Sequence, residues 1–167
     1  RLASAAADIE GKVDTMVQLA LSDPAIVVRL LRIVNGSAYE TRDRADVVSM
    51  YRAITLMGNN EVRHQSTMLR KRSECQKNVS PMVAMAIAQT VFAASFARNL
   101  LDTRNPMVSD EGAIAVILSR LPDIFCAMQA PDEVCALKTV SKYKPGLYDS
   151  VFRELFNAEP GTLGREI

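Results

Sequence analysis

The apolar residues of this chain recur with helical spacing almost from end to end, and this constrains the fold more than any other feature. The stretch "DPAIVVRLLRIVNG", residues 23–36, is the clearest case. Its residues Val27, Leu30, Leu31 and Val34 form one apolar stripe along a helix of 3.6 residues per turn. No stretch alternates convincingly with the period of two that strands need. The sequence therefore predicts an all-α fold, a multi-helix bundle.

Helix ends are marked in the sequence. Asp23 can cap the helix that starts at Pro24, because its carboxylate accepts from free backbone N–H groups. Gly36 is expected to end that helix in the left-handed conformation. Ser49 is expected to cap the next helix, and Gly58 to end it.

A long helix is expected to start at Ser80 and Pro81, with Ser80 as its cap. Residues 78–97 carry no charge and are about as long as a bilayer span. Alanine dominates this stretch, and polar side chains such as Gln89 and Thr90 interrupt it. We therefore expect the central buried helix of a soluble bundle here, and no membrane association.

The following helix is expected to begin at Asp110, with Ser109 as its cap. Asp110 and Glu111 would then favour the positive end of the helix dipole. Pro122 is expected to break the pattern after about Leu121. The polar stretch "RKRSECQKN", residues 70–78, is interpreted as a linker between two packed halves of one domain, 1–73 and 80–167.

Composition excludes several classes of protein. A length of 167 residues fits one domain, and a net charge of +1 gives no general attraction to nucleic acid or to acidic membranes. Three cysteines without a CxxC pair disfavour a disulfide framework and a zinc ribbon. Reduced thiols indicate a cytoplasmic location.

The sequence shows no catalytic motif. It contains a single histidine, His64, so a metal site that needs two histidines cannot form within this chain. GxSxG, Walker A and GxGxxG patterns are missing as well. We accordingly predict no catalytic residue, no metal and no cofactor.

A modest basic cluster comprises Arg63, residues 70–72 and Lys77. We interpret it as a solvated helix end, because no aromatic residues interleave with it to stack on bases. Binding of nucleic acid remains a minor alternative.

Two motifs together resemble the signature of the HDOD domain family: "DPAIVVRLLRIVNGSAY", residues 23–39, and "SMYRAITLMG", residues 49–58. The matching positions, to which we assign structural or contact roles, are Asp23, Pro24, Leu31, Asn35, Ser37, Ser49, Ala53, Ile54 and Gly58. This chain departs from the family pattern where Gly36 interrupts the Asn-Ser pair and where Met57 replaces the usual leucine.

The second half resembles a degenerate HD-type metal-dependent phosphohydrolase. Gln89 and Thr90 stand where that family has "H-S", and "RLPDIF", residues 120–125, stands where it has "LLHDIG". Asp123 matches, but Pro122 replaces the histidine. The last residues, 151–167, resemble a later family helix and the start of the next. We therefore expect the chain to stop short within the domain.

The resemblance implies a regulatory protein-interaction module of bacterial signal transduction, without catalysis. Such a module would bind other signalling proteins or domains, for example as the output part of a two-component response regulator. A residual phosphohydrolase acting on nucleotides is the alternative. Oligomeric state and input signal are not indicated by the sequence.

The resemblance also changes the interpretation of Asn35, which becomes a structural or contact residue at a helix end. Its side-chain amide is expected to tie down the following loop. Replacing Asn35 with Ala should then lower stability by about 1 kcal/mol.

Overall fold

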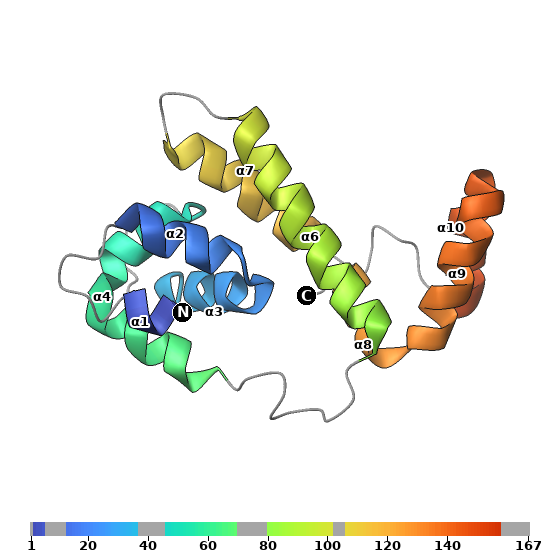
Figure 1. Cartoon of the computed structure of the whole chain (residues 1–167), viewed down its shortest axis with the longest axis horizontal. Helices are drawn as coiled ribbons and strands as arrows, with labels where there is room; N and C mark the ends of the chain where they lie inside the picture. Colours follow the sequence, from blue (N-terminus) through green and yellow to red (C-terminus); the bar gives the residue numbers. More distant parts are fainter. Residues whose placement is uncertain (1, 6–12, 37–45, 70–79, 102–105, 158–167) are drawn as a thin grey trace. The chain divides into compact units, whose positions relative to one another are not determined.

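The computed structural model describes residues 2–5, 13–36, 46–69, 80–101 and 106–157, and its secondary structure there is entirely helical (Figure 1). This confirms the predicted all-α class. The elements are α1 (Leu2–Ala5), α2 (Val13–Leu21), α3 (Pro24–Val34), α4 (Met50–Met68), α6 (Pro81–Leu100), α7 (Pro106–Ser119), α8 (Leu121–Gln129), α9 (Pro131–Tyr143), the 3-10 turn η1 (Pro145–Leu147) and α10 (Tyr148–Phe156).

The chain folds into two compact units. The first comprises residues 1–77 and 90–118, and the second comprises residues 78–89 and 119–167. This division differs from the sequence halves 1–73 and 80–167, because Thr90–Leu118 packs with the N-terminal helices. The end of α6 and most of α7 thus belong to the first unit.

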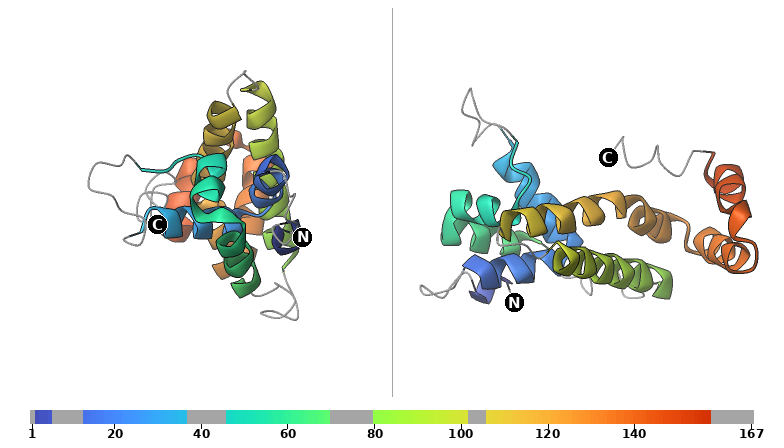
Figure 2. Two further views of the ribbon diagram at one scale, coloured as in Figure 1. Left: turned by 90° about the vertical axis from the view of Figure 1, so that its left-hand side faces the viewer. Right: turned by 90° about the horizontal axis from the view of Figure 1, so that it is seen from above.

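The first unit is built around α4. Helices α1, α2 and α3 all contact it, as the two further views also show (Figure 2). The apolar stripe expected on α3 is buried, with Val27 and Leu30 at most 1% exposed. Residues from α6 and α7, among them Ala94 and Ile117, complete the same core.

The predicted N-caps of three helices are present. Asp23 accepts a hydrogen bond from the backbone N–H of Ala25 at 3.0 Å. The Ser49 hydroxyl faces the N–H of Arg52 at 3.5 Å, and the Ser80 hydroxyl accepts from the N–H of Met82 at 3.2 Å. These bonds satisfy backbone donors that no helical carbonyl can reach.

The two glycines expected to end helices behave differently. Gly58 has φ 72° and ψ 163°, and it breaks α4 into two parts as predicted. The prediction of a left-handed Gly36 was wrong, since Gly58 is the glycine with positive φ among the described residues. At Gly36 a side chain would instead meet the carbonyl oxygen of Arg32 at 3.1 Å.

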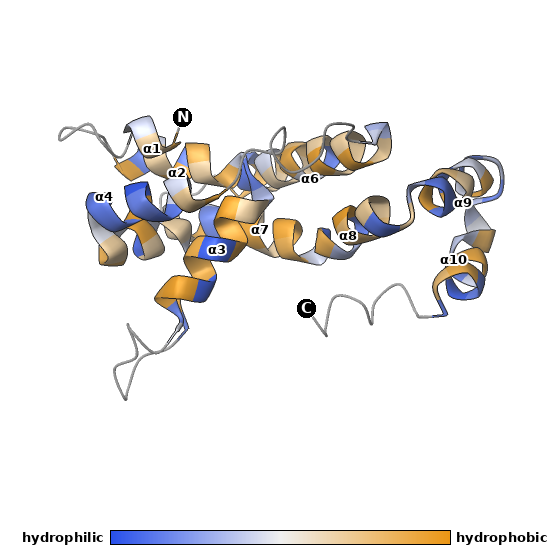
Figure 3. Cartoon of the chain, turned by 90° about the horizontal axis from the view of Figure 1, so that it is seen from below, coloured by the Kyte–Doolittle hydropathy of each residue, from blue (hydrophilic) through white to orange (hydrophobic). Residues whose placement is uncertain are grey.

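Helix α6 is buried along one face only, which corrects the expectation of a central buried helix. Its buried residues are Val83, Ala86, Thr90 and Ala94. Figure 3 shows that few of its residues are strongly hydrophilic. By length and composition α6 could also cross a membrane, and 22% of its most apolar stretch is buried in the structure. One such helix is weak support for a membrane span.

Helix α7 begins at Pro106, so the predicted start at Asp110 was wrong. Proline at the first helical position needs no hydrogen-bond acceptor, which makes it a favourable starting residue. Ser109 and Asp110 therefore lie inside the helix, and both are buried. Asp110 is consequently not a first-turn residue that stabilises the helix dipole.

The second unit contains α8, α9 and α10. Arg120 separates α7 from α8, and Pro122 is the second residue of α8, so the predicted break is present. Val83 and Ala86 of α6 form a small core with Ile124, Ala127 and Val134. On α10 the rings of Tyr148, Phe152 and Phe156 follow one another, with adjacent centroids 5.9 and 4.7 Å apart.

Candidate functional site

Asn35 links the two HDOD-like motifs. Its Nδ2 donates to the carbonyl oxygen of Val47 at 3.0 Å, and its Oδ1 accepts from the N–H of Val47 at 2.7 Å. Val47 leads into Ser49, the cap of α4. The side-chain amide thus holds the segment after α3, as expected from the sequence, and it does so through both of its polar ends.

The other motif positions lie in the core or at helix ends. Leu31, Ala53 and Ile54 are buried in the first unit. Pro24 is the first residue of α3, next to its cap Asp23. Ser37 lies outside the described residues. The polar side chains of Asp23, Asn35 and Ser49 accept or donate hydrogen bonds within the first unit, and Leu31, Ala53 and Ile54 contribute to its core.

The basic cluster can be described only at Arg63, which is exposed, because residues 70–72 and Lys77 lie outside the described part of the chain. His64 is exposed as well. Neither residue lines either of the two pockets described below.

The second unit contains a pocket of about 200 Å³ at the degenerate HD positions. Gln89 of α6 and Asp123 of α8, which are 34 positions apart in the sequence, both line it. Pro122 is buried and does not line the pocket. The complete lining is Gln89, Arg120, Asp123, Cys126, Val134, Leu137, Lys138, Tyr148 and Phe152.

Two positively charged side chains, Lys138 and Arg120, line this pocket. The ammonium Nζ of Lys138 lies 3.4 Å from Oε1 of Gln89, and it forms no ion pair with any described carboxylate. The Nη1 of Arg120 lies 3.8 Å from Oδ2 of Asp123, with both side chains close to half exposed. An ion pair so long and so solvated is weak, so Arg120 is held loosely.

Burial raises the pKa of two other lining groups. The pKa of the Cys126 thiol is raised by burial and, to a lesser extent, by the charge of Asp123. The pKa of the Tyr148 phenol is raised mainly by burial, with a smaller contribution from Asp123. Both groups therefore stay protonated at neutral pH, and the phenol is a hydrogen-bond donor.

The pocket offers little to a divalent metal. No three residues of the His, Cys, Asp and Glu types cluster with metal-binding geometry anywhere in the described ranges. The carboxylate of Asp123 is the one anionic side chain of the lining. A metal held there would also face Lys138 and Arg120, whose positive charges repel it.

Lys138 and Tyr148 were not found by sequence reasoning. Lys138 lies on α9 and Tyr148 on α10, far in sequence from the residues that resemble the HD motif. Each follows the polar pattern of an ordinary amphipathic helix, so no local signal distinguishes it from a solvated side chain. Arg120 lies in the stretch that resembles the HD motif, but no role in a site was predicted for it or for Cys126.

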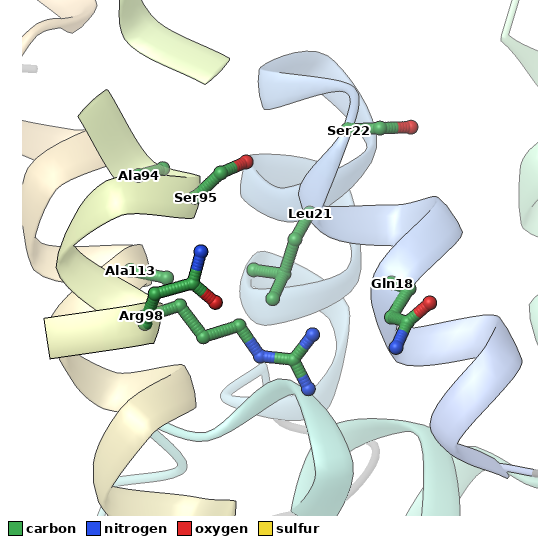
Figure 4. A pocket seen from close by; sticks show the side chains of 8 residues that line it. Gln18, Leu21, Ser22, Ala94, Ser95, Arg98 and Ala113 are labelled. Carbon is green, nitrogen blue, oxygen red and sulfur yellow. The ribbon is translucent and has the colours of Figure 1, made fainter. Parts of the chain in front are cut away.

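A second pocket, of about 260 Å³, lies within the first unit between α2, α6 and α7. Arg98 extends into it from α6 and Gln18 from α2 (Figure 4). The guanidinium of Arg98 is already paired, since its Nε lies 3.1 Å from Oδ1 of Asp110. This pocket therefore presents no unpaired charge to a ligand.

Asp110 is a buried carboxylate at this ion pair, with its side chain 1% exposed. Within the described residues, neither of its oxygens makes a hydrogen bond of standard geometry. Burial raises the pKa of Asp110, and Arg98 and the nearby backbone N–H of Tyr51 counteract this rise only in part. Asp14 of α2 raises the pKa slightly further.

Comparison with models of protein families gives a match over the whole chain. The family model of the HDOD domain matches residues 1–167. No curated protein and no solved structure matches the chain. The matched range includes both N-terminal motifs and the pocket of the second unit.

Proposed function

Because the chain belongs to the HDOD family of HD-like domains, which are generally non-catalytic, we propose that it is a regulatory module of bacterial signal transduction that binds other signalling proteins and catalyses no reaction. The proposal includes a cytoplasmic location. It also includes a role as the output part of a two-component response regulator.

The lining of the pocket in the second unit supports the proposal that the chain catalyses no reaction. An HD-type hydrolase activates water on a divalent metal, which needs several ligands with free lone pairs. Here Asp123 is the anionic ligand available, and the charges of Lys138 and Arg120 oppose a cation. An ammonium or guanidinium group has no lone pair to give to a metal.

Metal analysis together with a phosphodiesterase assay tests this part. The purified protein, incubated with Mn²⁺ or Mg²⁺ and then desalted, should retain no stoichiometric metal and should hydrolyse no nucleotide substrate. Bound metal and hydrolysis that both disappear in Asp123→Ala, but persist in Asp132→Ala, would contradict it. Asp132 is an exposed acid on α9 outside the pocket, and it serves as the matched control.

An apolar stripe on α6 supports the protein-binding part. Phe92, Phe96 and Leu100 are spaced four residues apart on one helix face and are 74%, 57% and 70% exposed. Exposed apolar side chains gathered in this way are typical of interaction surfaces. An apolar face of a partner helix fits such a stripe.

The stripe is tested by complementation of a deletion strain. Wild-type protein and Tyr143→Glu should restore the lost signalling response, whereas the double variant Phe92→Glu/Phe96→Glu should not. Tyr143 is 75% exposed on α9 and controls for the loss of an exposed aromatic residue. The proposal fails if deletion changes no response and cross-linking through position 96 yields no signalling protein.

A further inference from the structure

The pocket of the second unit has the charge pattern of an anion site. Lys138 and Arg120 contribute two positive charges, and Asp123 contributes one negative charge. Lys138 forms no ion pair among the described residues, and Arg120 is paired with Asp123 only at 3.8 Å. The lining therefore carries a net positive charge, and one of its two cations lacks a counter-ion.

Neutral hydrogen-bond donors and an apolar wall accompany these cations. The amide of Gln89 and the protonated phenol of Tyr148 line the same pocket. Val134, Leu137 and Phe152 are buried residues that supply apolar surface. A volume of about 200 Å³ is smaller than most drug-sized sites, which selects for a small ligand.

We propose that this pocket binds a small phosphate monoester, with Lys138 and Arg120 on the phosphate and the apolar wall against its organic part. The inference rests on the proposed non-catalytic function, because in this pocket the side chains of Lys138 and Arg120, and not a metal ion, would hold the phosphate. Binding of this kind would make the second unit a ligand-sensing part of the module.

The existing contacts oppose such binding only weakly. An exposed ion pair as long as that of Arg120 and Asp123 contributes little to stability, so Arg120 can turn toward a phosphate at small cost. The contact of Lys138 with the neutral amide of Gln89 is long, at 3.4 Å. Charge-assisted bonds to phosphate are shorter and stronger than this contact.

Isothermal titration of the full chain with inorganic phosphate and with phenyl phosphate tests the proposal. Both probes should bind without added metal, and phenyl phosphate should bind more tightly, because its ring can contact the apolar wall. Binding should weaken as salt is added. Equal affinity for phenyl phosphate and for phenol would overturn the proposal, because the phosphate would then contribute nothing.

Two variants locate the site. Lys138→Gln should lower the affinity about tenfold or more, the usual effect of losing a charged hydrogen bond. Asp123→Asn should raise the affinity, because it removes the negative charge from the lining and releases Arg120. Lys142→Gln is the matched control, since Lys142 is one turn further along α9 and does not line the pocket. Equal losses in the Lys138 and Lys142 variants would overturn the assignment.

The outcomes separate this inference from the proposed function. If neither probe binds, with or without metal, the phosphate site is refuted and the non-catalytic module is unaffected. If phosphate binds only with Mn²⁺ and Asp123→Asn abolishes that binding, the pocket is a metal site. Both proposals are then refuted.

Discussion

The side-chain amide of Asn35 forms two hydrogen bonds with the main chain of Val47, twelve residues further along the chain. Val47 is only 3% exposed, so its N–H and C=O have little access to water. The pair fixes Val47 beside the end of α3, two residues before Ser49 caps α4. A residue at the end of one helix thereby determines where the next helix begins.

Replacing Asn35 with Ala should therefore lower the free energy of unfolding by about 1–3 kcal/mol, because it leaves both polar groups of Val47 unpaired. Denaturant titration measures the loss. Asn60→Ala is the control, since Asn60 is an exposed amide on α4. If Asn35→Ala were as stable as Asn60→Ala but could not complement a deletion strain, a contact role for Asn35 would be the better explanation.

A second variant at the same position separates the two bonds. Asn35→Asp keeps the acceptor for the Val47 N–H but places a carboxylate oxygen against the Val47 carbonyl oxygen. It should therefore be less stable than wild type, and protonation of the new carboxyl at acid pH should recover part of the loss. An Asp variant as stable as wild type at pH 7 would show that the bond to the carbonyl contributes nothing.

Gly58→Ala should destabilise the first unit by about 1–3 kcal/mol. The backbone of Gly58 lies in a region of φ and ψ that is almost exclusive to glycine. No atom lies within 4 Å of an added Cβ, so the cost is backbone strain and not a clash. Gly146→Ala, also in open space but without positive φ, should change thermal stability little. Equal effects of the two substitutions would contradict this account.

Removal of either partner of the Arg98–Asp110 pair should have unequal effects. Arg98→Gln leaves a buried carboxylate without its counter-ion and should cost about 1–3 kcal/mol. Asp110→Asn removes the buried charge and should be at least as stable as wild type at pH 7. The double variant should recover most of the loss caused by Arg98→Gln. Equal losses in the two single variants would contradict this prediction.

The pH dependence of stability gives a separate check on Asp110. The fold raises the pKa of this carboxyl above its ordinary value of 3.8, so the folded state holds the proton more tightly than the unfolded state does. The contribution of Asp110 to stability should rise as the pH falls from the pKa of the folded state to that of the unfolded state, near 3.8. Below pH 3.8 it should stay constant, because both states are then protonated. Denaturant titrations between pH 7 and pH 4 should show this slope in wild type and lack it in Asp110→Asn. A slope that persisted unchanged in the Asn variant would assign it to other groups.

Cys126 should react with iodoacetamide more slowly than Cys135. Burial raises the pKa of the Cys126 thiol, so less of the reactive thiolate is present at pH 7. Cys135 is exposed. Mass spectrometry of a Cys75→Ser variant measures the two labelling rates without interference from the third thiol. Faster labelling of Cys126 would contradict the burial of its sulfur.

The helices and their starts could be predicted from the sequence because their determinants are local. Asp23, Ser49 and Ser80 each cap a helix through a backbone N–H two or three residues away. The start of α7 was the exception, since Ser109 was predicted to cap a helix from Asp110, whereas the helix begins at Pro106. Serine as a cap and proline at the first helical position are both good starting signals, so local rules do not distinguish the two positions.

The amino-acid sequence by itself determined the helical class, most helix boundaries and the family motifs. Tertiary structure alone decided that Thr90–Leu118 packs with the N-terminal helices, that Asp110 is buried against Arg98, and that Lys138 reaches the pocket of Gln89. Lys138 and Gln89 are 49 residues apart, and a polar residue on a helix face carries no mark of its distant neighbour. Caps depend on a few adjacent residues, whereas a pocket depends on how whole helices pack.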